Sequence, residues 1–518
     1  MANKHLFQRM VGKLILPADS LNNEFAPAYA LSNEGALAQY ATTGCLNTTF
    51  YATDSDQLGT VINLCEKVDP LFVAQTAVYA RETGYMKDMP ALLCAYLAAK
   101  DVCLTDRVFD RVVDNGKMLR NFVQILRSGV VGRKSLGTAP RRMVRNWLDR
   151  RSDEAVFRAS VGNEPSLADI IKMVHPRPGT KTREALYGHL IGRTVDRDAL
   201  PELVRKYEDY KAGRLALLPD VPFQMLTSLD LGTYEWKEIA RKAPWQMTRL
   251  NLNTFARHGV FEDPQMTELI AKRLRDPEAI AKARVFPYQV MTTYIQAGTN
   301  VPLVVREALQ DAMEIATANV PAIAGKVYVF PDVSGSMTWA SVTGFRKGAT
   351  SVVRAIDVAA LVAATIVRKN PTAEVIPFEQ SLVRVKVNPR DSIMTNADRL
   401  SKVGGGGTNC SAPLKMLNMR KAKGDLVVYI SDNESWVDAK GSRGTETMRQ
   451  WNAFKQRNPK ARMVCIDIQP YGTTQAYDRS DILNIGGFSD NVFTVVSEFA
   501  AGHLMTDQWV GRIKDVAL

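Results

Sequence analysis

The sequence of 518 residues has no apolar run of eighteen or more residues, which is the length that a membrane-spanning helix needs. A short apolar patch at 11–17 is followed by no cleavage site of the kind that ends a signal peptide. We therefore expect a protein of the cytoplasm that has no membrane partner.

Cysteine is scarce, and no Cys-x-x-Cys pair occurs. The six residues fall mostly within apolar patterns; they are Cys45, Cys65, Cys94, Cys103, Cys410 and Cys465. This usage argues against a disulfide framework. We expect buried free thiols in a reducing compartment.

A catalytic set is also missing. The five histidines are scattered along the chain, and no pair of acids accompanies an obvious nucleophile. The glycine run at 404–407 is not followed by the Gly-Lys-Ser/Thr of a phosphate-binding loop, and Ser334 lacks the flanking glycines of a nucleophile elbow. We predict that the protein is not an enzyme and has no catalytic residues.

What the sequence does contain is a long helical region. Residues 1–58 show little periodicity, and we expect an extended arm there. From about 59 to 317, apolar residues recur at spacings of three and four, interrupted by Pro, Gly and Asp-Pro. Many short helices with short connections favour a stack of helical pairs of the HEAT kind, which we place in a domain spanning 1–325.

After Pro321 the pattern changes to alternating strands and helices. Strands are predicted at 326–331, 373–378, 425–431, 462–468 and 492–496, with a further short one at 382–387, and helices at 348–369, 411–422 and 443–457. Strands separated by helices form a doubly wound, mostly parallel sheet of the Rossmann type, and such a sheet binds its ligands at the carboxyl ends of its strands. We assign this α/β domain to 326–518.

Three polar loops follow the predicted strands or lie between them. The strand 326–331 ends in Asp-x-Ser-x-Ser, the glycine run leads to Thr408, and the strand 425–431 ends in Asp432. A carboxylate with two hydroxyls on one tight turn supplies part of the oxygen shell that a hard divalent cation needs. The two later loops can complete that shell.

Together the three loops resemble the metal-ion-dependent adhesion site of von Willebrand factor A domains. The resemblance implies that the ligands are oxygen atoms, several acting through water, of Asp332, Ser334, Ser336, Thr408 and Asp432. The implied cofactor is a divalent metal, Mg²⁺, with Mn²⁺ or Ca²⁺ as alternatives. A site of this kind normally awaits a carboxylate from a partner rather than activating water.

The formal net charge is +12, and much of it is local. Residues 133–193 carry 13 Lys and Arg against 6 Asp and Glu. Arginine can fork two hydrogen bonds onto a phosphate and stack its plane on a base, so this segment favours RNA over a merely solvated cationic face. The candidate RNA-binding residues are Arg141, Arg142, Arg145, Arg150, Arg151, Arg158, Lys172, His175, Arg177 and Lys181.

Four stretches narrow the field to one family. They are the basic helix beginning at Gly137, the Asp-Val-Ser-Gly-Ser-Met at 332–337, the Gly-Gly-Thr-Asn-Cys at 406–410 and the Asp-Asn-Glu-Ser-Trp at 432–436. Together they resemble the Ro autoantigen family, the TROVE-domain proteins that include bacterial Ro-related proteins. The resemblance implies a toroid of HEAT-like repeats followed by the adhesion-type domain.

That resemblance also implies the partners. They are small noncoding Y-like RNA, the single-stranded 3′ ends of misfolded or structured RNAs, and an exoribonuclease such as polynucleotide phosphorylase. The family has a histidine that helps bind Y RNA at a helix end matching His175. The residues alone leave an alternative open, namely a protein-adhesion scaffold that depends on the metal and has no RNA specificity.

Overall fold

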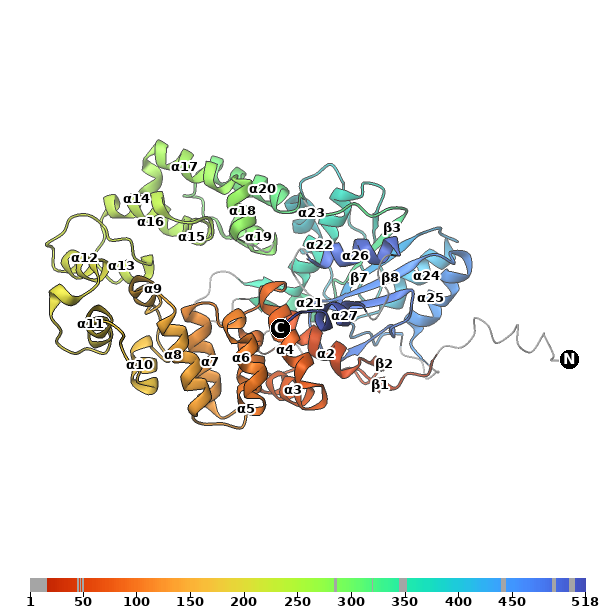
Figure 1. The fold of residues 1–518 in the computed structure, drawn as a ribbon. Helices are drawn as coiled ribbons and strands as arrows, with labels where there is room; N and C mark the ends of the chain where they lie inside the picture. The colour runs from red at the N-terminus through yellow and green to blue at the C-terminus, as the bar shows by residue number, and fades with distance from the viewer. Residues whose placement is uncertain are drawn as a thin grey trace. The chain divides into compact units, whose positions relative to one another are not determined.

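The computed structural model describes residues 16–518 except 44–45, 47, 49–50, 284–286, 319, 344–351, 439–443, 487–490 and 503–507. The chain forms two compact units (Figure 1). The helical unit comprises Val68–Leu274, Ala297–Arg306 and Val516–Leu518. The sheet unit comprises Met1–Lys67, Arg275–Gln296 and Glu307–Asp515.

The helical unit contains short helices that follow one another closely. They are α4 (Pro70–Glu82), α5 (Asp88–Lys100), α6 (Val102–Val112), α7 (Gly116–Ser128), α8 (Thr138–Asp149), α9 (Asp153–Arg158), α10 (Leu167–Val174), α11 (Lys181–Leu190), η1 (Arg197–Ala199), α12 (Glu202–Lys211), α13 (Phe223–Leu226), α14 (Thr233–Lys242), α15 (Trp245–Leu250), α16 (Leu252–Arg257), η2 (Val260–Glu262) and α17 (Pro264–Leu274). Helices near in sequence pack on one another: α5 contacts α4, α6 and α7, and α10 contacts α7, α8 and α11. Such local packing is expected of a stack of helical pairs.

Side-chain caps set where many of these helices begin. Asp69 accepts a hydrogen bond from the Leu71 amide, with proline at the first position of α4. Ser166 and Asp169 form a reciprocal capping box at the start of α10. Each cap satisfies amide groups that the first helical turn leaves without a partner.

Buried tryptophans fix the packing of the helices. Trp147 is fully buried, and its indole donates a hydrogen bond of 2.6 Å to the Val113 carbonyl. Trp245 is buried as well and donates one of 3.0 Å to the Leu274 carbonyl. Burying a large ring while satisfying its N–H orients each helix pair in one way.

The sheet unit is built on five parallel strands. In spatial order they are β10 (Ile482–Gly486), β8 (Arg462–Asp467), β7 (Leu426–Ser431), β3 (Val327–Pro331) and β6 (Glu374–Val375). All residues of β3, β7 and β10 are buried, because helices cover both faces of a parallel sheet. The near-continuous apolar runs in the sequence therefore come from the central strands.

Helices connect the strands on opposite faces. Helix α22 (Ala355–Lys369) packs on β3, β6 and β7 and also contacts α23 (Ile393–Leu400). Helices α24 (Ser411–Met419) and α25 (Glu446–Arg457) lie on the other face of the sheet (Figure 1). The core under α24 and α25 contains Phe330, Tyr429 and Trp451. Because side chains alternate along a strand, the intervening residues of β3 and β7 face α22.

The order of the strands places a topological switch point between β3 and β7. The chain leaves β3 through α22 toward β6 on one side, and it leaves β7 through α25 toward β8 on the other. At such a point the two connections diverge and open a crevice at the carboxyl ends of the strands. Asp332 and Asp432 directly follow β3 and β7 there.

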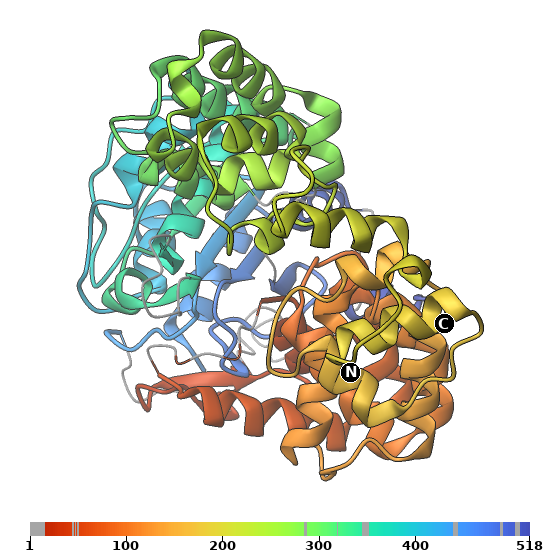
Figure 2. The same cartoon turned by 90° about the vertical axis from the view of Figure 1, so that its left-hand side faces the viewer.

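The N-terminal residues belong to the sheet unit. Strands β1 (Ser20–Leu21) and β2 (Pro27–Ala30) form a hairpin, and β2 pairs with β9 (Thr473–Thr474), so the hairpin drawn in red lies against the blue C-terminal part (Figure 2). Helix α2 (Asn33–Thr43) packs on β10 and on α27 (Gln508–Lys514). The compact units therefore do not coincide with the predicted limits of 1–325 and 326–518.

The remaining elements of the sheet unit connect these parts. They are α3 (Asp54–Lys67), α18 (Pro277–Ala283), α19 (Pro287–Gln296), α20 (Leu303–Ala316, divided between the units), α21 (Gly335–Trp339), the short pair β4 (Ser341–Thr343) and β5 (Val353–Arg354), and α26 (Asn491–Ala501).

Three predicted elements are wrong. The residues 492–496 lie in α26 rather than in a strand, and the outer strand is β10. The segment 382–387 forms only an isolated bridge at Leu382. The predicted arm at 1–58 contains α2, whose small residues Ala36, Ala38 and Ala41 are buried. The predicted helix 348–369 corresponds to α22, which begins at Ala355. Residues 348–351 of the predicted range lie outside the described ones.

The cysteines follow the prediction with one exception. Cys65, Cys94, Cys410 and Cys465 are buried free thiols, whereas Cys103 is exposed and free. Burial raises the pKa of the Cys410 thiol and keeps it protonated. Cys45 lies outside the described residues.

Across the part of the chain that the structure describes, no helix is long and apolar enough to cross a membrane.

Candidate functional site

The three polar loops predicted from the sequence meet at the switch point. The Asp332 amide donates to the Ile430 carbonyl at 2.9 Å, which joins the ends of β3 and β7. The Gly405 amide donates to the Val333 carbonyl and the Gly335 amide to the Gly406 carbonyl, both at 2.8 Å. The Asp-x-Ser-x-Ser turn is thereby bound to the glycine loop on one side and to β7 on the other.

The glycine loop has no space for side chains where it crosses the turn. Gly404 has a φ of +89°, and a Cβ atom there would lie 2.0 Å from the Val333 carbonyl oxygen. A Cβ atom on Gly407 would lie 2.6 Å from the Trp436 ring. Glycine at these positions permits the close approach that brings Thr408 to the carboxyl end of the sheet.

All five predicted ligands are buried at this place. Asp332, Ser334 and Asp432 are 0% exposed, Thr408 is 1% exposed and Ser336 is 4% exposed. The Ser334 amide donates to Asp332 Oδ1 at 2.9 Å, and the hydroxyls of Ser334 and Ser336 lie 3.2 Å apart. The structure thus brings together two carboxylates and hydroxyl groups, the oxygen donors that Mg²⁺ prefers.

The electrostatics of the site fit a bound cation. Burial and the charge of Asp432 raise the pKa of Asp332, and burial, with the charge of Glu24, raises the pKa of Asp432. Asp432 Oδ2 is buried and has no hydrogen-bond partner among the described residues. A divalent ion would offset the cost of burying both charges and would give that oxygen a partner.

The site is not a carboxylate-rich metal cluster. In the described part of the chain, no group of three or more His, Cys, Asp and Glu side chains is arranged to hold a metal ion. The candidate centre depends instead on serine and threonine hydroxyls. The fit therefore favours a hard cation that prefers oxygen ligands and keeps several of its waters.

Sequence reasoning missed three residues that support the site. Ser431 donates a hydrogen bond of 2.5 Å to Asp332 Oδ2, and Glu379 accepts one of 2.7 Å from the Gly406 amide. Asp467, at the end of β8, is 1% exposed, and burial together with the charge of Asp432 raises its pKa. Ser431 could have been found in the sequence, because it is the polar residue that ends an apolar run. Glu379 and Asp467 could not, because only the order of the strands brings them to the site.

In the helical unit, the structure divides the ten predicted RNA-binding residues into two groups. One group has partners within the protein. Arg142 lies 3.7 Å from Asp106, Arg150 pairs with Asp110, and the guanidinium of Arg151 lies 3.5 Å from the centre of the Trp147 ring. Arg145 donates a hydrogen bond of 2.5 Å to the Val174 carbonyl, which ties α8 to the end of α10.

The second group is exposed at the surface of the helical unit. Arg141, Lys172, His175, Arg177 and Lys181 have no side-chain hydrogen bond or ion pair among the described residues. Arg141 lies one turn before Arg145 on α8, and the other four follow one another from the end of α10 to the start of α11. We call these five residues the cationic surface.

His175 has a structural role through its backbone. It ends α10 in the left-handed conformation, with φ +48°, and its amide donates to the Ile171 carbonyl. Its side chain is exposed. The cap therefore fixes the position of the histidine and leaves the ring accessible.

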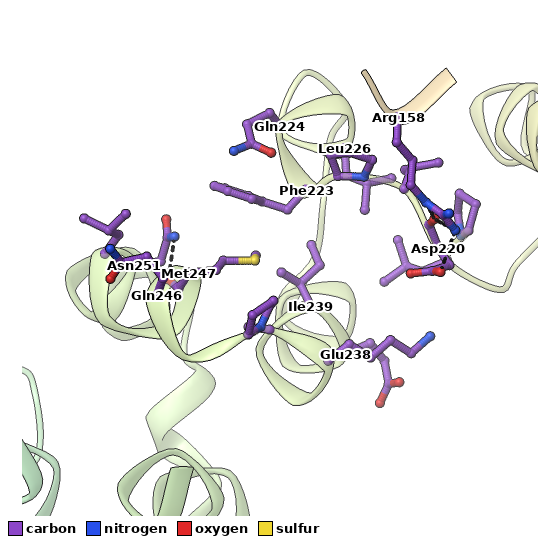
Figure 3. A pocket seen from close by; sticks show the side chains of 18 residues that line it. Arg158, Asp220, Phe223, Gln224, Leu226, Glu238, Ile239, Gln246, Met247 and Asn251 are labelled. Atoms are coloured by element: carbon purple, nitrogen blue, oxygen red, sulfur yellow. Dashed lines mark hydrogen bonds and ion pairs between the residues drawn. The ribbon is translucent and has the colours of Figure 1, made fainter. Parts of the chain in front are cut away.

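Arg158 lies at a cavity rather than on the cationic surface. Its guanidinium donates to the Asp220 carboxylate at 2.9 Å, at the edge of a cavity of about 640 Å³ in the helical unit (Figure 3). The lining is mainly apolar and includes Phe223, Ile239 and Met247. We attribute to Arg158 the anchoring of the segment before α13.

A doubly wound parallel sheet with these three loops at its switch point defines a domain of the von Willebrand factor A class, here joined to a helical unit. Residues 326–500 match the family model of the Ro60 vWA domain, which confirms the resemblance to the Ro family.

Comparisons over longer stretches agree. The chain is 24% identical over 519 residues to the RNA-binding protein RO60 of Deinococcus radiodurans, covering 93% of this chain and 95% of that one. It is 25% identical over 259 residues to the RNA-binding protein RO60 of Caenorhabditis elegans, covering 47% of this chain and 38% of that one. The fold matches the crystal structure of the Deinococcus radiodurans RO (RSR) protein with a TM-score of 0.59 and 22% identity, over 91% of this chain and all of that chain.

Proposed function

We propose that this protein binds RNA through the cationic surface and forms a ribonucleoprotein with a small noncoding Y-like RNA. The observation that carries the proposal is a set of five exposed side chains, from α8 and from the end of α10 to the start of α11, that make no side-chain hydrogen bond or ion pair with the described residues. Two relatives named as RNA-binding proteins support it. The arginines and lysines would hold phosphates, and His175 would contact a base or phosphate.

We extend the proposal to RNA quality control in the cytoplasm. The protein would hold single-stranded 3′ ends of misfolded or structured RNAs and present them to an exoribonuclease such as polynucleotide phosphorylase. In this proposal the chain binds RNA and leaves cleavage to its partner. Support comes from the family resemblance, and the residues of the cationic surface offer positive charge and planes on which bases can stack.

For the switch point we propose a Mg²⁺ site. Asp332 and Asp432 would hold the ion with the hydroxyls of Ser334, Ser336 and Thr408, some through water. A bound ion there would supply a position for a carboxylate from a partner. The support is the buried Asp432 oxygen, which has no hydrogen-bond partner in the described part of the chain, and the buried hydroxyls on the loops that meet there.

A second function, protein adhesion at this metal site, has one observation in its favour. Apolar side chains of the sheet unit are exposed on or beside the loops that surround the candidate ligands. Trp339 is 81% exposed and Trp436 is 42% exposed. A partner that presents a carboxylate could bury these rings.

Measuring affinity against salt concentration tests the RNA proposal. A structured RNA with a single-stranded 3′ tail would be titrated with the full chain at several salt concentrations. Contacts to three or four phosphates predict a slope of log affinity against log salt of about −3. RNA binding with a slope near zero, or no RNA binding, would favour the adhesion scaffold.

A further inference from the structure

The tip of the N-terminal hairpin lies on the loop that follows Asp432. The Asn22 side chain donates a hydrogen bond of 2.8 Å to the Ser435 carbonyl, and the Asn23 amide donates one of 2.7 Å to the Glu434 carboxylate. Asn22 is 5% exposed. The hairpin is thus bound to the carboxyl end of β7, where the candidate metal ligands lie.

The tip has a defined shape. Asn22 Oδ1 accepts hydrogen bonds from the amides of Glu24 and Ala26, at 3.1 and 2.9 Å. Phe25 takes the left-handed conformation with φ +57°, and its side chain is 84% exposed. A turn held by its own asparagine keeps Glu24 in one place at little further entropic cost.

The Glu24 carboxylate is half-buried near Asp432. Burial, together with the charges of Asp432 and Glu24, raises the pKa of the Tyr51 hydroxyl. The charge of Glu24 also raises the pKa of Asp432. Without a cation, the charges of Glu24 and Asp432 would oppose each other, and Asp432 Oδ2 would keep no hydrogen-bond partner among the described residues.

We propose that Glu24 supplies the metal site with a carboxylate from within the chain, so that the hairpin tip occupies the position a partner's carboxylate would take. This inference rests on the proposed metal site. It deepens that proposal because a partner would have to displace Glu24 before it could bind the ion. The adhesion site would then have a built-in competitor whose release exposes the metal.

Calorimetric titration of the full chain with Mn²⁺, with and without acetate, tests the inference. Glu24→Gln keeps the size of the side chain but removes its charge, and we expect metal affinity to fall by about 10-fold. Acetate offers the missing carboxylate, so it should restore affinity to Glu24→Gln while leaving the wild type unchanged. Glu278→Gln, at an exposed position of the sheet unit, is the matched control.

A second variant separates a ligand from a distant charge. Glu24→Asp keeps the charge but shortens the side chain. If Glu24 is a metal ligand, this variant should bind metal more weakly. If Glu24 acts through its charge alone, metal affinity should be unchanged. This variant also tests the inference if Glu24→Gln fails to fold.

The outcomes distinguish the inference from the metal site. If Glu24→Gln binds Mn²⁺ as the wild type does, or if acetate strengthens binding equally in both, Glu24 is not a metal ligand and the inference is overturned. If the wild type binds no metal, or if Asp332→Asn binds it equally well, the metal site is overturned together with the inference. RNA binding measured in parallel would be unaffected by either result.

Discussion

At the scale of single residues, arginines that look alike in the sequence differ in role. Arg151 stacks on the buried Trp147 and donates to the Trp147 and Asp114 carbonyls at 2.8 and 3.1 Å. Arg177 is exposed and makes no side-chain hydrogen bond or ion pair with the described residues. Charge counting cannot separate the two, because the difference depends on which carbonyls and rings the fold places nearby.

This difference predicts two separate effects. Arg151→Gln should lower the free energy of unfolding by about 1–2 kcal/mol, because it loses a cation–π contact and two hydrogen bonds. Arg177→Gln should leave stability unchanged within about 0.5 kcal/mol but weaken RNA binding. Urea unfolding and RNA titration of both variants check this. If Arg151→Gln is as stable as the wild type but binds RNA more weakly, Arg151 contacts RNA and belongs to the cationic surface.

The metal ligands give a second prediction for single residues. At a metal concentration of 100 times Kd, binding stabilises the native state by about 2.7 kcal/mol, which raises the unfolding temperature by roughly 4 °C in a unit of about 300 residues. Asp332→Asn should abolish that increase. Because the variant also removes a buried charge, its unfolding temperature without metal should equal or exceed that of the wild type.

Thermal unfolding with and without Mg²⁺ measures both quantities, with Asp515→Asn as an exposed control. An Asp332→Asn protein that responds to Mg²⁺ like the control would contradict the site.

At the scale of elements, the sequence predicts the buried strands and their polar ends well. β3, β7 and β8 begin and end within two residues of the predictions, because buried parallel strands are short apolar runs that stop at polar residues. The pattern fails at 492–496, where Val, Phe and Thr favour a strand but the segment is helical and packs on β8 and β10. Tertiary packing overrides a weak local preference.

The N-terminal hairpin could not be predicted from local pattern. Its strands have two and four residues, and the pairing of β2 with β9 joins segments more than 440 residues apart in sequence. The same long-range pairing brings Glu24 to the loop after Asp432. This part of the candidate site therefore needed the structure. The polar turns after β3 and β7 and the glycine loop before Thr408 could be recognised in the sequence, and the resemblance to adhesion sites implied the set of five ligands.

The glycine loop provides a prediction at this scale. Gly404 and Gly405 both have positive φ values. A Cβ atom added at Gly404 would lie 2.0 Å from the Val333 carbonyl oxygen. A Cβ atom added at Gly405 would have no atom within 4 Å among the described residues. Gly405→Ala should cost about 1–2 kcal/mol of stability for its backbone conformation alone. Gly404→Ala should cost more and should abolish the stabilisation by Mg²⁺, because the loop must move away from the turn.

Comparing thermal unfolding of the two variants removes the shared contribution of the backbone. Equal losses of stability, with the response to Mg²⁺ intact in both variants, would show that the loop does not pack against Val333 as described.

At the scale of the whole molecule, the two candidate functions lie in different units. The cationic surface belongs to the helical unit, and the metal ligands belong to the sheet unit. Changes in one should therefore leave the other intact. Asp332→Asn should bind structured RNA with the wild-type affinity, and a loss of RNA binding in that folded variant would mean that the metal site takes part in RNA recognition.

The central claim is that RNA binds to the cationic surface rather than responding to the net charge of +12. Replacing Arg141, Lys172 and Arg177 with Gln removes three exposed cations of that surface and leaves Arg145 to hold α10. Lys242, Arg257 and Lys272, exposed on later helices of the same unit, form a charge-matched control triple.

The most direct test is the salt dependence of RNA affinity for the wild type and both triple variants. We predict that the Arg141, Lys172 and Arg177 triple flattens the slope of log affinity against log salt by about two to three units, and that the control triple changes it by less than about one. Equal changes from the two triples would contradict binding at the cationic surface and would mean that RNA affinity depends only on the net charge of the protein.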